Sequence, residues 1–212
     1  MTGPTHKAYS VTFAFITAML FYKLGVTEIN YYFALIILLM SSKHGAKFPD
    51  VDHHWKNVGD KTVPNKIINT IIRATGGKHR SWQTHSWDIC LVFTIASYQI
   101  PRALYNTGKI SNVNKEVMNI ILLGFASGWI SHMISDMLTS AGVQVLCFSK
   151  KKIALVPKSI GKLRFNTGNE WEAFNYKTIK IINIILGLTC LIYPYILQGK
   201  LSWLKDWLIQ LF

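Results

Sequence analysis

The sequence predicts an all-α protein, an integral membrane bundle of about five transmembrane helices followed by an interfacial helix at the carboxy terminus. Composition is the first observation behind this prediction. Half of the 212 residues are hydrophobic, only 16% are charged, and the mean hydropathy is positive, which is high for a soluble domain. The second observation is that the apolar residues gather in stretches close to the roughly 20 residues that a helix needs to cross a bilayer.

Each apolar stretch predicts one helix. The five stretches are Ala8–Leu24, Ile29–Met40, Ile89–Leu104, Val117–Leu138 and Thr178–Leu197. The second is short without its flanks, and Pro101 and Arg102 leave the end of the third open. The first has no small-residue cleavage site after it, so we expect a retained helix rather than a signal peptide.

Apolar and polar residues alternate at helical spacing in the tail, Leu201–Phe212, with Trp203 and Trp207 on one side. This pattern is typical of a helix that lies in the membrane interface. The chain has no long linker, low-complexity tract or internal repeat, so we expect residues 1–212 to form a single domain.

Basic residues predict the orientation of the bundle. With five spans, 17 of the 23 lysines and arginines fall on or nearest the side of the amino terminus, and 6 fall on the other side. Cytoplasmic loops of membrane proteins carry such an excess, so the amino-terminal side is expected to face the cytoplasm. The carboxy terminus would then lie outside it.

Histidines and aspartates cluster at the ends of these stretches. His6 precedes the first stretch, and the clusters lie at 50–54, 79–85 and 132–136. The alternation of five spans places all of them on the cytoplasmic side, although they were not used to draw the spans. Ionisable groups at membrane depth are costly and mark functional sites. The sequence therefore predicts a single metal site at the cytoplasmic face.

The fourth stretch carries the sharpest pattern. His132 and Asp136 are four residues apart and share one helical face, which continues back through Gly128 and Gly124. Small residues on such a face allow another helix to approach closely in lipid. A His–Asp hydrogen bond that only holds two helices together would give the same pattern. The other histidines on the same side favour metal binding.

The second cluster follows Pro49, which disfavours helix at the residue before it. Asp50 and Asp52 can share a face of a turning segment, and His53 adds an imidazole beside them. We expect Asp50 or Asp52 to bridge two ions or orient a water molecule. A solvated acidic turn is the alternative interpretation, whether His54 joins the site stays open, and His44 is expected to be an ordinary surface histidine.

His79 and His85 are six residues apart, which suits a loop that leads into a helix start with Thr84 as a plausible cap. Arg80 lies between them. A guanidinium offers a rigid fork for phosphate, so Arg80 is the candidate to bind an anionic substrate group. Its alternative role is that of a topology-determining charge.

Three motifs in order resemble the YdjM-type membrane-bound metal-dependent hydrolases, which are bacterial inner-membrane proteins. The motifs are Phe48-Pro49-Asp50-Val51-Asp52-His53, His79-Arg80-Ser81-Trp82-Gln83-Thr84-His85-Ser86, and Ser131-His132 through Asp136 to Gly142. The resemblance covers roughly residues 1–172, and Thr167–Glu172 is similar to the family's end piece, which leaves a role for Glu170 open. More distantly, the His-x-x-x-Asp helix is similar to that of zinc-dependent phospholipase C and related single-strand nucleases.

The resemblance implies eight ligands, enough for two divalent ions. They are His6, Asp50, Asp52, His53, His79, His85, His132 and Asp136. Imidazole and carboxylate together suit zinc first, with manganese or iron as alternatives. Two ions about 3.5–4 Å apart suit phosphoester hydrolysis.

We therefore expect a hydrolase of a phosphoester in a lipid or lipid-linked substrate, with catalytic roles for Asp50, Asp52 and Arg80 and with membrane lipids as partners. A nuclease is the second hypothesis, because the net charge is +13 and tryptophans lie near the site. A metal-stabilised membrane adaptor without activity is the third. The sequence leaves the substrate and the oligomeric state open.

Overall fold

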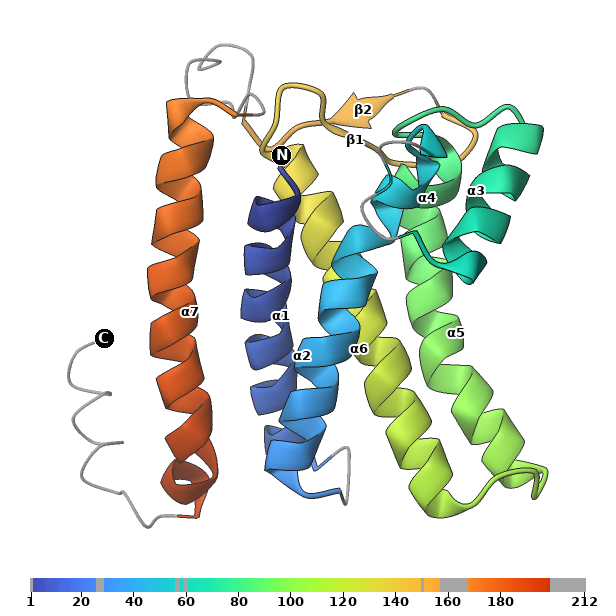
Figure 1. Cartoon of the computed structure of the whole chain (residues 1–212). Coiled ribbons are helices and arrows are strands. Elements are labelled where there is room, and N and C mark those ends of the chain that lie inside the picture. Colours follow the sequence, from blue (N-terminus) through green and yellow to red (C-terminus); the bar gives the residue numbers. More distant parts are fainter. Residues whose placement is uncertain are drawn as a thin grey trace.

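The computed structural model describes residues 2–25, 29–55, 58, 61–149, 151–156 and 168–198. Five long helices lie side by side and alternate in direction along the chain (Figure 1). They are α1 (Gly3–Lys23), α2 (Tyr31–Lys47), α5 (Trp87–Asn106), α6 (Asn112–Met137) and α7 (Glu170–Leu197). The prediction of an all-α fold is confirmed.

Each predicted stretch corresponds to one of these helices. The open question at Pro101 is resolved, because α5 continues through this residue and ends at Asn106. Among the described residues, α6 and α7 are long and apolar enough to cross a membrane by length and composition. The other three helices are shorter, at 21, 17 and 20 residues. The predicted interfacial helix, Leu201–Phe212, lies outside the described residues.

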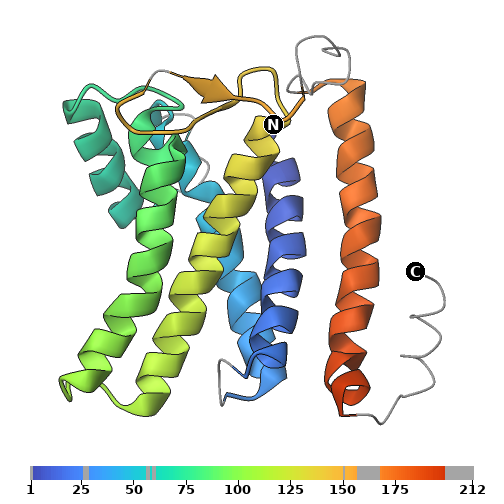
Figure 2. The ribbon, with the colours of Figure 1, turned by 180° about the vertical axis from the view of Figure 1, so that it is seen from behind.

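The centre of the bundle is α6, which packs against α1, α2 and α5, whereas α7 packs against α1 at the edge (Figures 1 and 2). Three glycines bring α2 and α6 into backbone contact. A Cβ atom on Gly128 would overlap the carbonyl oxygen of Ser42, and one on Gly45 would overlap that of Phe125. A Cβ atom on Gly124 would instead overlap the side-chain hydroxyl of Ser41. The small-residue face predicted around Gly124 and Gly128 is thus the surface of α6 that contacts α2. We call this contact, made by Gly45, Gly124 and Gly128, the glycine seam.

Short elements cover the end of the bundle at which α1 begins (Figure 1). They are the 3-10 helix η1 (Pro49–Asp52), α3 (Val63–Ala74), α4 (Trp82–His85) and an antiparallel pair of two-residue strands, β1 (Val143–Gln144) and β2 (Lys152–Ile153). The side chain of Thr62 caps α3 by accepting from the backbone N–H of Asn65, and proline in the first turn suits the helix start. These elements hold the loops that carry the histidine and aspartate clusters.

Candidate metal centre

All eight predicted ligands and Arg80 converge at this end of the bundle. Ion-pair distances between their side chains range from 3.0 to 3.9 Å and connect every one of them to another member. They come from α1 (His6), η1 and the residue after it (Asp50, Asp52, His53), the loop before α4 (His79, Arg80), α4 (His85) and α6 (His132, Asp136). The side chains predicted to share a site therefore lie together at one end of the bundle.

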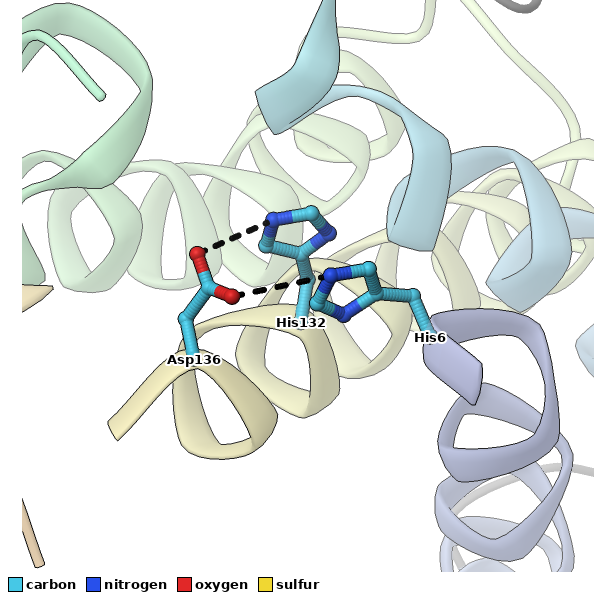
Figure 3. Close-up of side chains that lie close together, drawn as sticks. All are labelled: His6, His132 and Asp136. Carbon is cyan, nitrogen blue, oxygen red and sulfur yellow. Dashed lines mark ion pairs between the residues drawn. The ribbon is translucent and has the colours of Figure 1, made fainter. Parts of the chain in front are cut away.

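An inner group consists of His6, His132 and Asp136, and all three are buried (Figure 3). The Nε2 atom of His6 lies 3.6 Å from Oδ1 of Asp136, and Nε2 of His132 lies 3.7 Å from Oδ2. Ligand atoms about 2.1 Å from a tetrahedral zinc ion would be about 3.4 Å apart. The spacing of this group therefore fits a shared ion.

Hydrogen bonds fix which nitrogen of each imidazole carries the proton. His132 Nδ1 lies 2.7 Å from the carbonyl oxygen of Ala46, which can only accept, so Nδ1 donates. His6 Nδ1 lies 2.6 Å from the hydroxyl of Ser135, which in turn donates its own proton to the carbonyl of His132. In the neutral rings, both Nε2 atoms therefore present a lone pair towards Asp136.

His85 repeats this arrangement from α4. Its Nδ1 lies 3.1 Å from Oδ2 of Asp52, and its Nε2 lies 3.6 Å from Oδ2 of Asp136. The Nε2 atoms of His85 and His132 are buried and lack a hydrogen-bond partner within the described ranges. Burial lowers the pKa of His85, which favours its neutral form. Lone pairs that face a carboxylate oxygen repel it, so a cation between them is the arrangement that satisfies all three groups.

An outer group consists of Asp50, His53 and His79, which are partly exposed. Oδ1 of Asp50 lies 3.6 Å from Nε2 of His53 and 3.9 Å from Nε2 of His132. A third set of converging ligand atoms belongs to Asp50, His85 and His132, and it joins the inner group to the outer one. Asp50 is therefore shared by the outer group and the joining set, as a residue that bridges two ions would be.

Asp52 has a different position from the one predicted. It is fully buried, and its two oxygens accept from the rings of His79 and His85, the hydroxyl of Thr84 and the backbone N–H of Ser81. Burial alone would raise the pKa of the Asp52 carboxyl, but the hydrogen bonds from the two histidines hold it well below its usual range. Asp52 belongs to none of the three converging groups among the described residues. Its place behind the histidines therefore suits a positioning residue.

Arg80, predicted to bind an anionic substrate group, contacts the inner group. Its Nη2 atom lies 3.1 Å from Oδ1 of Asp136, and its Nη1 atom donates to the hydroxyl of Thr139 at 3.4 Å. Its backbone has a positive φ of 60°, which is unfavourable for a residue with a Cβ atom. These contacts offset that cost and hold the guanidinium at the edge of the inner group.

Three residues that support the site were not predicted from the sequence. From α3, the Asn69 amide donates to the carbonyl of His53 at 2.8 Å, and Arg73 donates to that of Asp52 at 3.0 Å. From α6, the indole of Trp129 donates to the carbonyl of Thr84 at 2.9 Å. Apolar residues recur at helical spacing along α3, between the capping threonine and Gly76. This pattern is a sequence signal for a helix.

The two residues whose roles the sequence left undecided, His54 and Glu170, lie outside the candidate centre. His54 and Glu170 are exposed and belong to none of the converging groups among the described residues. Glu172 is buried instead, and its carboxylate accepts from the hydroxyls of Thr2 and Thr5 at 2.8 Å each. It thereby ties the start of α7 to the start of α1, next to His6.

The role of Asp52 can be tested with an amide. In Asp52→Asn, one side-chain atom becomes a donor, so the side chain can no longer accept from both His79 and His85. We expect metal affinity to fall roughly 10–100-fold, as for other partners of metal-bound histidines, while the protein stays folded. Metal content measured over a chelator series checks this. Asp88→Asn is the matched control, because Asp88 instead accepts from the backbone of Cys147, and equal affinity in the two variants would contradict the assignment.

Among curated proteins and solved structures, none is significantly similar to this chain. A family relationship is nevertheless clear, and it agrees with the apolar helices and with the histidine and aspartate motifs. The chain belongs to the family described as YdjM inner membrane protein, which matches it over residues 1–201.

Proposed function

We propose that the protein is a membrane-bound metal-dependent hydrolase that cleaves a phosphoester in a lipid or lipid-linked substrate. The observation that carries the proposal is the pair of ligand groups joined through Asp50 and His132. Two adjacent groups of this kind suit a pair of divalent ions, and such pairs are typical of phosphoester hydrolases. Zinc fits the mixture of imidazole and carboxylate ligands, and manganese or iron would fit the same donors.

The charge of the centre supports an anionic substrate. Asp50, Asp52 and Asp136 contribute three negative charges and Arg80 one positive charge, which leaves two negative charges. Two divalent ions would therefore give the centre two positive charges in excess. A phosphate group would be attracted to it, whereas a neutral ester or amide would not be.

Three residues of the chain would each have a separate role in the reaction. The bound ions would supply a water molecule of lowered pKa and neutralise charge on the phosphate. Asp50, partly exposed between the two groups, would orient that water molecule. Asp52 would keep His79 and His85 in the tautomer that exposes Nε2, and Arg80 would hold a phosphate oxygen from the edge of the inner group.

The proposed orientation places the centre at the cytoplasmic face of a five-span bundle. The five long helices alternate in direction, and the centre lies at the end where α1 begins (Figure 1). The excess of basic residues on that side supports its assignment to the cytoplasm. The site would then act on the inner leaflet of the bacterial inner membrane.

A reporter fused after the last residue tests the orientation. Five spans place the carboxy terminus outside the cytoplasm, so we expect an alkaline phosphatase fusion to be active and a fluorescent protein fusion to be dark. The same reporters fused after Gly108, in the turn between α5 and α6, are expected to behave identically and serve as control. A cytoplasmic carboxy terminus together with an external Gly108 would contradict the span assigned to α7.

Activity is tested with a phospholipid, an isoprenyl phosphate and single-stranded DNA, each with and without chelator. We expect chelator-sensitive release of phosphate or headgroup from a lipid. Arg80→Lys keeps the positive charge but loses the two-pronged guanidinium that binds phosphate. We therefore expect the fold-increase in KM to exceed the fold-decrease in metal content. Cleavage of DNA alone would replace the proposal by a nuclease, and full metal content without turnover of any substrate would favour the adaptor.

A further inference from the structure

A groove of about 460 Å³ runs between α1 and α7, on a side of α1 that does not face the metal centre. Apolar side chains line much of its length, among them Val11, Phe15 and Ile184. His6 points instead towards Asp136 on α6 (Figure 3). The groove is therefore a separate feature of the molecule.

The groove is basic at one end and apolar at the other. Lys7, Lys43 and Lys180 line it from three different helices and are exposed. Lys7 lies one turn into α1 and Lys43 one turn before the end of α2, so both lie near the end that carries the metal centre. Phe15 lies about 12 Å further along α1, at 1.5 Å per residue.

The positive charge of the groove is not compensated by carboxylates of the described residues. No acidic residue lines it, and none of the three lysines forms an ion pair with a carboxylate in the part of the chain that the structure describes. The ammonium of Lys180 lies 5.3 Å from the centre of the Tyr176 ring, another lining residue. The three exposed lysines are thus available to an anion at the groove.

The two walls of the groove are held together by hydrogen bonds. The amide of Asn183 donates to the carbonyl of Ala8 at 2.9 Å and accepts from the hydroxyl of Thr12 at 2.6 Å. The hydroxyl of Tyr9, which lies between Ala8 and Thr12 on α1, pairs with Asn175, about two turns before Asn183 on α7. These contacts fix the spacing between α1 and α7, so the groove is a built part of the fold.

We propose that this groove binds an anionic phospholipid of the bilayer. Its phosphate lies among Lys7, Lys43 and Lys180, and an acyl chain follows Val11, Phe15 and Ile184 towards the membrane interior. Charge complementarity selects the headgroup, as in other basic pockets between helices on the cytoplasmic side. The apolar walls select a lipid over a soluble anion. The inference rests on the proposed placement of the bundle in the membrane and does not depend on hydrolysis.

The test measures lipid retained by the full-length protein. The chain is reconstituted with equal amounts of phosphatidylglycerol and phosphatidylcholine and released into mild detergent, and bound lipids are counted by native mass spectrometry. We expect phosphatidylglycerol to be retained at least roughly tenfold over phosphatidylcholine. The triple variant Lys7→Gln, Lys43→Gln, Lys180→Gln should lose this preference. Lys66→Gln, Lys151→Gln, Lys152→Gln removes the same charge elsewhere on the same side and should keep it.

A second variant separates the groove from general surface charge. Val11→Trp fills the apolar part and leaves the lysines in place, so we expect it to lose the retained lipid as well. Full retention by Val11→Trp or by the triple groove variant would overturn the proposal, and so would displacement of the lipid by millimolar inorganic phosphate alone. Metal content should stay unchanged in all variants, which distinguishes failure of this inference from failure of the metal centre.

Discussion

Replacing His132 by alanine is expected to reduce the bound metal from about two ions per chain to one or none. His132 belongs to both the inner group and the set that joins it to the outer group, so its loss removes a candidate ligand from each. Its Nδ1 atom also ties α6 to the end of α2 through the carbonyl of Ala46. Elemental analysis of the purified protein, with membrane insertion checked in parallel, measures the effect.

His54→Ala is the control for this prediction. His54 is exposed, lies next to the outer group in sequence and belongs to none of the converging groups within the described residues. It should keep full metal content. If His132→Ala also kept full metal content, His132 and Asp136 would be a helix-packing pair, and the ions would have to lie elsewhere.

The second large effect is a loss of stability and of bound metal, which we expect for Gly128→Ala. One added methyl group would overlap the backbone of α2 at Ser42, which is not the end of a flexible side chain and cannot turn aside. The helices must move apart, and overpacking of this kind costs about 1–3 kcal/mol and sometimes more. His132 follows one turn after Gly128 and Asp50 follows the end of α2, so the same movement separates the ligands.

The measurement combines thermal unfolding in detergent with metal content. Gly3→Ala is the matched control, because Gly3 also lies in a helix and no atom of the protein lies within 4 Å of its added Cβ. It should be as stable as the unmodified chain or slightly more stable, since alanine favours helix. A Gly128→Ala protein that unfolds like the control and binds metal normally would show that the glycine seam is not needed.

The sequence predicted the helices because their signal is local. An apolar run of sufficient length forms a helix in lipid, where every backbone polar group must be paired within its own segment. α3 lacks such a run and was missed, because its helix depends on packing of Asn69 and Arg73 against the residues around η1. The sequence did not predict where α5 ends, because the effect of a proline depends on its surroundings. It kinks or breaks a helix in water, whereas neighbouring helices in lipid allow a helix to continue through it.

The members of the site could also be predicted, whereas their roles could not. The alternation of spans brings His6, the loop clusters and α6 to one side, so convergence follows from topology alone. The distinction between Asp50 and Asp52 depends on which carboxylate faces the ring edges and which faces the ions. Two residues of the same type separated by one position carry no sequence signal for that difference. Glu172 was overlooked in favour of Glu170 for the same reason.

The glycine seam also bears on permeation. Ions and protons cross a protein along rows of water molecules or chains of polar groups, and backbones in contact leave no room for such a row. Gly128 lies one turn before His132 on α6, Gly45 packs against the carbonyl of Phe125, and Gly124 lies one turn further from the ligands. In the proposed placement across the membrane, cations drawn to Asp50 and Asp136 would therefore find no passage between α2 and α6. A charged centre could then lie in this bundle without dissipating an ion gradient along that path.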